Sequence, residues 1–269
     1  MTHALDYLEQ PDFGSTGPRK IAYRHIAHKT RPDLQSQSSD TPAGILFCGG
    51  FHSNMDGGKA EFLHEKCAQA GMAFTRFDYG GHGLSGGAFA DGTIGDWYCD
   101  ARLIFDQICT GPQIVVGSSM GAWMALMLAR DRAPRVAGLV LVAPAPDFPR
   151  KLMLPQLPKQ AMVDLQRDGV WYRPSEFEDD PYPITAKLIE ESKAHELLDG
   201  PSVWVDGPVT ILHGTKDEVV PLSHAQTVAN WVQGDPVTLT TIEGGDHRLS
   251  TAPDLDRLWQ AIETTIGSS

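Results

Sequence analysis

The chain has 269 residues, of which 41% are hydrophobic, and its 34 acidic and 22 basic residues give a formal net charge of −12. This length suits one large α/β domain with an insertion, and the negative charge repels phosphate backbones and anionic bilayers, so we expect no nucleic-acid partner. The apolar stretches are too short for a membrane span, and the segment Met1–Phe13, with Asp6, Glu9 and Asp12, resembles no secretory or transit signal, so we expect a cytoplasmic protein.

Short β-branched or continuously apolar runs recur along the chain and predict strands that are covered on both faces. The predicted strands are Ile45–Cys48, Ala73–Tyr79, Ile114–Val116, Val136–Ala143, Val209–His213 and Val237–Ile242. Before them, Arg19–Ala27 is expected as an antiparallel edge strand, and Thr30–Pro42, rich in Ser, Gln, Asp and Pro, as a solvated loop.

Apolar residues at helical spacing separate these strands, before Gly71, after a predicted Thr93 cap, and near the end of the chain. Strands that alternate with helices predict an α/β fold of the doubly wound type, with a mainly parallel sheet.

Residues 144–207 interrupt the alternation, because an ordinary connection between neighbouring strands is far shorter. Two pieces punctuated by proline have helical spacing, Lys159–Arg167 and Ile184–Leu198. We therefore predict a small helical cap at residues 144–207, inserted between two strands of a core that comprises residues 1–143 and 208–269.

Ser119 lies in the run Gly117–Gly121 (GSSMG), between a predicted strand and the helix-forming run Ala122–Arg130. A Gly-x-Ser-x-Gly run in this context is typical of a nucleophile elbow, where a tight turn exposes the serine hydroxyl at a helix N-terminus. The helix dipole there favours developing negative charge. We therefore predict that Ser119 is a nucleophile.

The pattern alone is weakly specific, because 27 of the 269 residues are glycine and each serine matches it by chance at roughly 1%. Ser85 in Gly83–Gly87 (GLSGG) matches as well, and Gly81–Gly86 even spells GxGxxG. No helical pattern follows, so we interpret this segment as a glycine-rich loop without a nucleophile or a pyrophosphate site.

A serine hydroxyl needs a base, and the base needs an acid that fixes its tautomer. In this fold the three are expected in the order Ser, acid, His. Asp217 follows the predicted strand Val209–His213, and His247 follows Val237–Ile242, so both are expected at the same rim as Ser119. We predict His247 as the base and Asp217 as the acid, with Glu218 and Asp246 as alternative acids.

The tetrahedral intermediate needs two backbone N–H donors, one after the nucleophile and one after an early strand. Met120 and Phe51 fit these places, since Phe51 follows Gly49–Gly50 at the end of a predicted strand. The alternative for Gly49–Gly50 is a plain glycine turn.

Nothing in the sequence indicates a cofactor or a metal. Gly57-Gly58-Lys59 suggests a phosphate loop, but Ser53 stands where the first glycine is required and Ala60 where Ser or Thr is required. No His or Cys set has zinc spacing, and the cysteines form no CxxC pair. We expect all four, Cys48, Cys67, Cys99 and Cys109, to be buried, reduced thiols.

Several runs together show a family likeness: Gly49–Ala60, Arg76–Ser85, Gly117–Trp123, His213–Pro221 and Asp246–Arg248. With them the chain resembles the mitochondrial α/β-hydrolases of the palmitoyl-protein thioesterase and acyl-glucuronide esterase type. The resemblance implies the α/β-hydrolase fold, a Ser119, Asp217 and His247 triad, and fatty-acyl thioesters or bulky acyl esters as substrates. Because Met1–Phe13 does not have the composition of a mitochondrial leader, we expect a bacterial cytoplasmic relative.

The sequence thus predicts a serine hydrolase that transfers an acyl group from an ester or thioester to water through Ser119. Apolar cap residues could line an acyl pocket or simply pack the cap onto the sheet. These residues are Leu152, Met153, Leu154, Leu157, Met162, Leu165 and Trp171. The alternatives are a peptidase or an acyltransferase with the same triad, and a pseudo-hydrolase that only binds.

Overall fold

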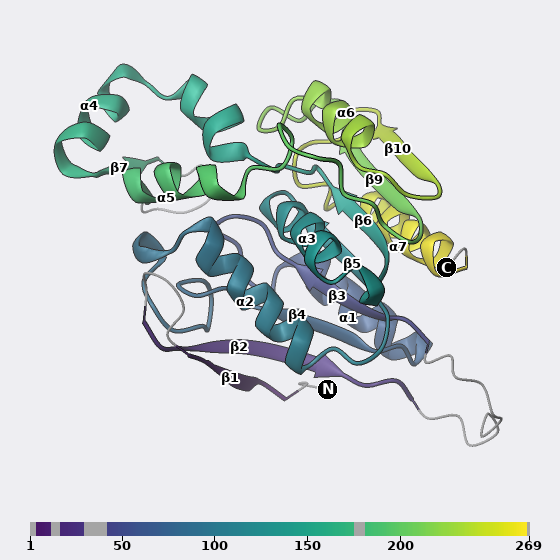
Figure 1. Cartoon of the computed structure of the whole chain (residues 1–269). Coiled ribbons are helices and arrows are strands. Elements are labelled where there is room, and N and C mark those ends of the chain that lie inside the picture. Colours follow the sequence, from purple (N-terminus) through teal and green to yellow (C-terminus); the bar gives the residue numbers. More distant parts are fainter. Residues whose placement is uncertain (1–3, 12–16, 30–41, 175–180, 268–269) are drawn as a thin grey trace.

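The computed structural model describes residues 4–11, 17–29, 42–174 and 181–267. These residues form an eight-stranded sheet in the order β1-β2-β4-β3-β5-β6-β9-β10 (Figure 1). The strands are β1 (Asp6–Gln10), β2 (Arg19–Ile26), β3 (Gly44–Cys48), β4 (Phe74–Phe77), β5 (Gln113–Ser118), β6 (Val136–Val142), β9 (Val209–Gly214) and β10 (Val237–Ile242). The pairs β1–β2 and β2–β4 are antiparallel. All neighbouring strands from β4 to β10 in this order are parallel to one another. This confirms the predicted doubly wound, mainly parallel sheet.

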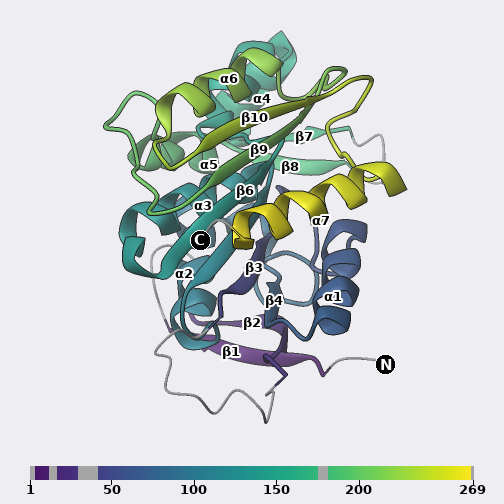
Figure 2. The same ribbon diagram turned by 90° about the vertical axis from the view of Figure 1, so that its right-hand side faces the viewer.

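Helices cover both faces of the sheet (Figure 2). α1 (Gly58–Ala70) and α7 (Ala252–Gly267) pack on one face, and α2 (Ile94–Gln107), α3 (Met120–Asp131) and α6 (Leu222–Trp231) pack on the other. The central strands are therefore buried on both sides, which explains why they read as unbroken apolar runs. Val115 and Leu141 face the α3 side, while Val116 and Val142 face α7.

Local signals set the helix ends as predicted. The Thr93 hydroxyl accepts a hydrogen bond from the backbone N–H of Asp96 and so caps the first turn of α2. α1 ends at Gly71, which adopts φ 72° in the left-handed region, and the Gly71 N–H donates to the Cys67 carbonyl.

Residues 144–207, which we call the cap, connect β6 to β9 and extend away from β1 and β2 (Figure 1). They contain α4 (Lys159–Asp168), the antiparallel pair β7 (Val170–Arg173) and β8 (Tyr182–Thr185), and α5 (Ala186–Glu191). Leu165, Leu188 and Leu197 belong to the same buried cluster as α2 and α3. The division into core and cap at residues 144–207 stays a prediction.

Four expectations need correction. Val237–Ile242, predicted as a strand covered on both faces, is the edge strand β10, and three of its six residues are exposed. The predicted strand Arg19–Ala27, observed as β2, is antiparallel to its neighbours as expected, but it is not the edge strand, because β1 pairs with it on the outer side. Ile184–Leu198 is not one helix, since Ile184 lies in β8 and α5 ends at Glu191. Cys99 is only half-buried, whereas Cys48, Cys67 and Cys109 are buried and all four are free thiols. The predicted loop Thr30–Pro42 lies almost wholly outside the described residues.

Unusual backbone geometry gathers at the carboxyl ends of the parallel strands. In the described part of the chain, the residues other than glycine with positive φ are His52, Ser119, Ala143, Asp147 and Leu249. Each follows a strand of the parallel sheet, and such strain is often found at functional sites. No helix among the described residues is long and apolar enough to cross a membrane.

Candidate active site

The run Gly117–Gly121, which we call the elbow, joins the end of β5 to the start of α3. Ser119 adopts φ 55° and ψ −116° and stands as the N-cap of α3. A Cβ on Gly121 would lie 2.0 Å from the carbonyl oxygen of Cys48, and one on Gly117 would lie 2.5 Å from that of Gly121. The turn therefore requires glycine at both positions, as the sequence pattern predicts.

The structure brings Ser119, His247 and Asp217 together from three loops. Nε2 of His247 lies 3.1 Å from Oγ of Ser119, and Nδ1 of His247 lies 2.8 Å from Oδ2 of Asp217. The carboxylate can only accept, so Nδ1 carries the proton and Nε2 is left as the acceptor that faces the serine hydroxyl. This tautomer is the one that a general base requires.

Asp217 is held by more than His247. Its Oδ1 accepts hydrogen bonds from the N–H groups of Val219, at 2.9 Å, and Val220, at 2.8 Å. Burial alone would raise the pKa of Asp217, but the hydrogen bonds from His247 and from the two N–H groups outweigh it and lower the pKa. The carboxylate is therefore ionised at neutral pH, although its side chain is only 1% exposed.

The two alternative acids do not reach His247 in this way. Oδ1 of Asp246 accepts a hydrogen bond from the Leu249 N–H at 2.9 Å, a local contact within its own loop. Glu218 is exposed. The geometry favours Asp217 over both.

The second matching serine has different partners. We call residues 81–87 the glycine loop. Oγ of Ser85 donates to the Asp78 carbonyl at 2.6 Å and accepts from the Ala22 N–H at 2.8 Å. The contacts tie the loop to β2 and to Asp78, the residue that follows β4, so Ser85 is a structural residue and not a partner of a base.

The loop after β3 lies directly against the elbow. A Cβ on Gly50 would sit 3.5 Å from Cβ of Ser119, so the Phe51 backbone is close to the nucleophile. Met120 is the first residue of α3, where a helix offers its N–H no internal acceptor. Phe51 and Met120 are thus placed where two donors could face one carbonyl oxygen.

The residues predicted to line an acyl pocket differ in how far they are buried. Met153 and Leu165 are buried, and Met162 is 38% exposed. Leu152, Leu154, Leu157 and Trp171 are partly buried and pack against the core cluster. The cap residues that contact the Phe51 ring are others, Phe148 at 5.3 Å and Tyr182 at 6.0 Å between ring centroids. Sequence reasoning missed both, because contact between loops so far apart in the chain leaves no local pattern.

Lys59, set aside above as part of a failed phosphate loop, contacts the loop that carries His247. Its Nζ donates to the Arg248 carbonyl and to the Ser250 hydroxyl. Burial lowers the pKa of Lys59 to about 8. Lys59 therefore ties the start of α1 to the loop that carries His247, so its role in the structure is to hold that loop.

No group of three or more His, Cys, Asp or Glu side chains that could hold a metal ion occurs in residues 4–11, 17–29, 42–174 and 181–267. The donors at the candidate site are instead a hydroxyl, an imidazole and one carboxylate, held in a line by the hydrogen bonds given above. This set suits proton transfer and nucleophilic attack.

The chain is similar in sequence and in fold to several known proteins. The family described as serine aminopeptidase, S33, matches residues 40–182. Bovine mitochondrial palmitoyl-protein thioesterase ABHD10 is 37% identical over 253 residues, which cover 91% of this chain and 82% of the relative. A crystal structure of a protein from Agrobacterium vitis S4 superposes with a TM-score of 0.88 at 34% identity, covering 98% of this chain and all of that one. Mouse α/β-hydrolase domain-containing protein 10 gives a TM-score of 0.82 at 34% identity, with 98% of each chain covered.

Proposed function

Since the chain belongs to the α/β-hydrolase family, and is thereby a hydrolase, we propose that it cleaves carboxylic esters or acyl thioesters through an acyl-enzyme on Ser119. The observation that carries this proposal is the continuous relay from the Ser119 hydroxyl through His247 to Asp217, with contacts of 3.1 and 2.8 Å. A pseudo-hydrolase has no need of this geometry.

In the first step, Oγ of Ser119 attacks the substrate carbonyl carbon while Nε2 of His247 takes the hydroxyl proton. The Asp217 carboxylate stabilises the imidazolium that results. As the tetrahedral intermediate collapses, His247 returns the proton to the leaving alcohol or thiol, and the acyl group stays on Ser119.

Charge that develops on the carbonyl oxygen is stabilised by the N–H groups of Phe51 and Met120. The N-terminus of α3 adds the favourable end of its dipole. Water then attacks the carbonyl carbon of the acyl-enzyme while Nε2 of the same His247 takes its proton. As the bond between that carbon and Oγ of Ser119 breaks, His247 returns the proton to Oγ, which restores the serine hydroxyl and releases the carboxylic acid.

For the substrate class we propose fatty-acyl or bulky acyl groups. The support is the name of the relatives, palmitoyl-protein thioesterase, and the apolar cap beside the Phe51 loop, where Phe148 and Tyr182 pack on the Phe51 ring. Among the predicted cap residues, Leu152, Leu157 and Trp171 are partly buried and suit an acyl pocket better than the more exposed Met162. A cytoplasmic location stays a prediction, since these relatives are named as mitochondrial.

A series of acyl-CoA thioesters from acetyl to palmitoyl tests this proposal. Each methylene that the pocket buries contributes up to about 0.8 kcal/mol, so kcat/KM should rise by up to about fourfold per methylene until the pocket is full. The reacting carbonyl is the same throughout, so the slope reports contacts remote from Ser119. A flat or falling profile would reject the fatty-acyl class.

Two controls complete the series. Leu157→Trp should shorten the preferred chain and leave acetyl turnover unchanged; an equal loss on all chains would mean that Leu157 packs structure. Peptide amides included in the panel separate the peptidase alternative, which predicts their cleavage at rates above those of the thioesters.

A further inference from the structure

His82 lies in the glycine loop and takes no part in the proposed mechanism, yet it is buried beside the active site. Its side chain is 4% exposed, and edge-on rings surround it at centroid distances of 5.6 Å for Tyr79, 5.0 Å for Phe89 and 5.2 Å for Trp97. This packing fixes the plane of the imidazole. A buried ring held so closely must also satisfy both of its nitrogens.

The two ring nitrogens have backbone partners of opposite kinds. Nδ1 lies 3.2 Å from the Gly80 carbonyl oxygen, and Nε2 lies 3.3 Å from the backbone N–H of His52. The carbonyl only accepts and the N–H only donates, so Nδ1 must carry the proton and Nε2 must accept from His52. Only the neutral imidazole in this tautomer satisfies both contacts.

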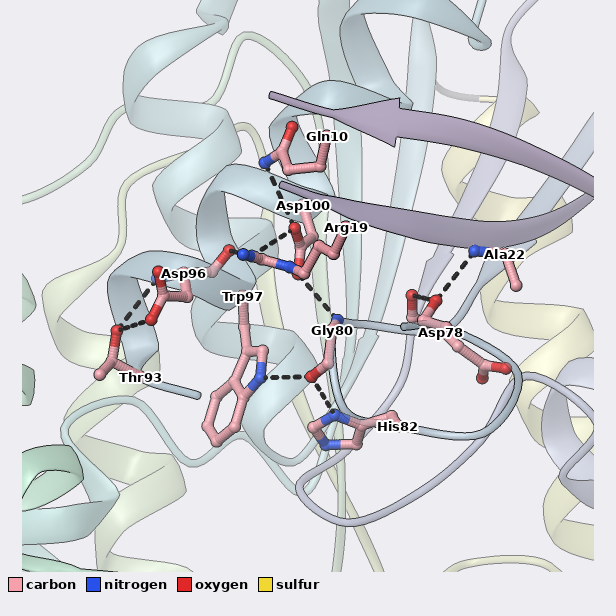
Figure 3. A network of polar contacts seen from close by, with 11 residues as sticks. Gln10, Arg19, Ala22, Asp78, Gly80, His82, Thr93, Asp96, Trp97 and Asp100 are labelled. Atoms are coloured by element: carbon pink, nitrogen blue, oxygen red, sulfur yellow. Dashed lines mark hydrogen bonds and ion pairs between the residues drawn. The ribbon is translucent and has the colours of Figure 1, made fainter. Parts of the chain in front are cut away.

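The carbonyl that holds His82 is itself fixed from the core (Figure 3). The Gly80 oxygen also accepts from Nε1 of Trp97 at 3.1 Å, and the Gly80 N–H donates to Oδ2 of Asp100 at 2.8 Å. Asp100 forms a buried ion pair with Arg19 at 2.7 Å. His82 is therefore held through Nδ1 by a hydrogen-bond network that reaches into the core, and its other nitrogen, Nε2, contacts the loop that contains His52.

His52 directly follows Phe51, the residue whose N–H we assign to the oxyanion. His52 has φ 55°, and its ring stacks on Tyr182 of the cap at 4.8 Å. A strained turn of this kind needs an outside contact to hold it. The hydrogen bond from the His52 N–H to His82 supplies one at the peptide that joins Phe51 to His52.

From this geometry, and resting on the proposed function, we propose that His82 is a positioning residue for the oxyanion hole. The neutral ring holds the peptide between Phe51 and His52. The N–H of Phe51 then faces the oxygen of the substrate carbonyl that Ser119 attacks. Burial lowers the pKa of His82 to about 4, partly opposed by the Gly80 hydrogen bond, so the ring stays neutral at neutral pH. A protonated ring would place an N–H against the His52 N–H and break the contact.

Two substitutions separate the two nitrogens. The amide of Asn reaches the place of Nδ1, so His82→Asn keeps the contact to Gly80 and loses the one to His52. The longer Gln reaches the place of Nε2, so His82→Gln offers an oxygen to the His52 N–H. We expect His82→Asn to lower kcat by about 10- to 100-fold with KM changed less than about threefold, because a displaced donor costs less than a deleted one. His82→Gln should recover most of this loss.

A transition-state analogue gives the readout that a merely structural role would not change. An alkyl trifluoromethyl ketone adds to Ser119 and places its oxyanion against the two N–H donors. Its inhibition constant should weaken in proportion to the loss of kcat/KM across wild type, His82→Gln and His82→Asn. Ser85→Ala, in the same loop, controls for general loosening and should change neither quantity.

The proposal is overturned if folded His82→Asn keeps kcat within twofold of wild type, if KM rises as much as kcat/KM falls, or if the ketone binds all variants equally. If His82→Asn does not fold, Trp97→Phe removes the indole donor to Gly80 and keeps the ring; a lower kcat at constant KM supports the proposal, and unchanged kcat overturns it. Failure of the proposed function is distinct, because wild type itself would then hydrolyse no ester or thioester.

Discussion

The elbow and the glycine loop carry the same Gly-x-Ser-x-Gly pattern, and the partners of their serine hydroxyls differ completely. At the elbow, Oγ of Ser119 faces an imidazole nitrogen that accepts a proton. In the glycine loop, Oγ of Ser85 is hydrogen-bonded to two backbone groups. The comparison teaches that the pattern specifies a tight turn, and that the nitrogen opposite the hydroxyl decides whether the turn can hold a nucleophile.

The surroundings of the two runs explain this difference. Ser119 lies between β5 and α3, so the sheet and a helix N-terminus fix its direction at the rim. The glycine loop follows β4 and is held by Asp78, whose carboxylate accepts from the N–H groups of Met55 and Leu84. The same carboxylate thus links the glycine loop to the loop between β3 and α1, which contains Phe51. The glycine loop supports the site without reacting in it.

The largest expected difference is in catalysis. Ser119→Ala should lower kcat by about 10⁵- to 10⁶-fold, since the covalent route is lost, whereas Ser85→Ala should leave kcat within about twofold. Steady-state turnover of the preferred acyl thioester measures both. Comparable losses in the two variants would remove the distinction between elbow and loop.

The relay behind Ser119 gives the next effect. Asp217→Asn should lower kcat by about 10³- to 10⁴-fold at neutral pH, because the imidazole loses both its tautomer and its counter-charge. Glu218→Gln and Asp246→Asn serve as matched controls, and turnover close to wild type is expected for each. Near-normal activity of Asp217→Asn would move the role to one of these two acids.

His82 in the glycine loop should make the free energy of unfolding depend on pH. The pKa of His82 is lowered by burial from 6.5 to about 4, so in this window the unfolded chain binds more protons than the folded one. Stability from this group is full above pH 6.5 and is lost as the pH falls towards 4, by about 3 kcal/mol at most. Urea unfolding at several pH values should show a shallower acid loss in His82→Asn than in wild type. Equal slopes would mean that His82 titrates normally in the folded chain.

Ser85 should have a smaller effect, on stability alone. Ser85→Ala removes two hydrogen bonds that tie the glycine loop to β2 and to Asp78 after β4, which we expect to lower the free energy of unfolding by about 1 to 2 kcal/mol. Denaturant midpoints of wild type and variant report the difference. A change in kcat larger than about twofold would show that Ser85 does more than hold the loop.

The sequence predicted those parts of the molecule that periodicity and spacing encode. The apolar and β-branched runs predicted the parallel strands. Because Ser119, Asp217 and His247 follow β5, β9 and β10, they were expected at one edge of the sheet. β5 and β9 are buried, whereas β10 is a half-exposed edge strand that its β-branched residues indicate; the carboxyl ends of parallel strands meet at a single edge, which is why the three loops converge.

The remainder depends on contacts that leave no local signal. β1 was missed because one face of this short edge strand is exposed and its pattern is barely alternating. β7 and β8 were missed because four-residue strands in a hairpin are too short to show a period. The role of His82 requires Gly80 and His52 to meet it from two separate loops, which only the folded chain reveals.

The most direct test of the central claim is the location of the covalent bond. A fluorophosphonate probe should label the wild-type chain once, and mass spectrometry of the digested protein should place the adduct on Ser119. The label should disappear in Ser119→Ala and persist in Ser85→Ala. An adduct on the peptide that contains Ser85, or labelling that survives Ser119→Ala, would contradict the assignment of the elbow as the site of reaction.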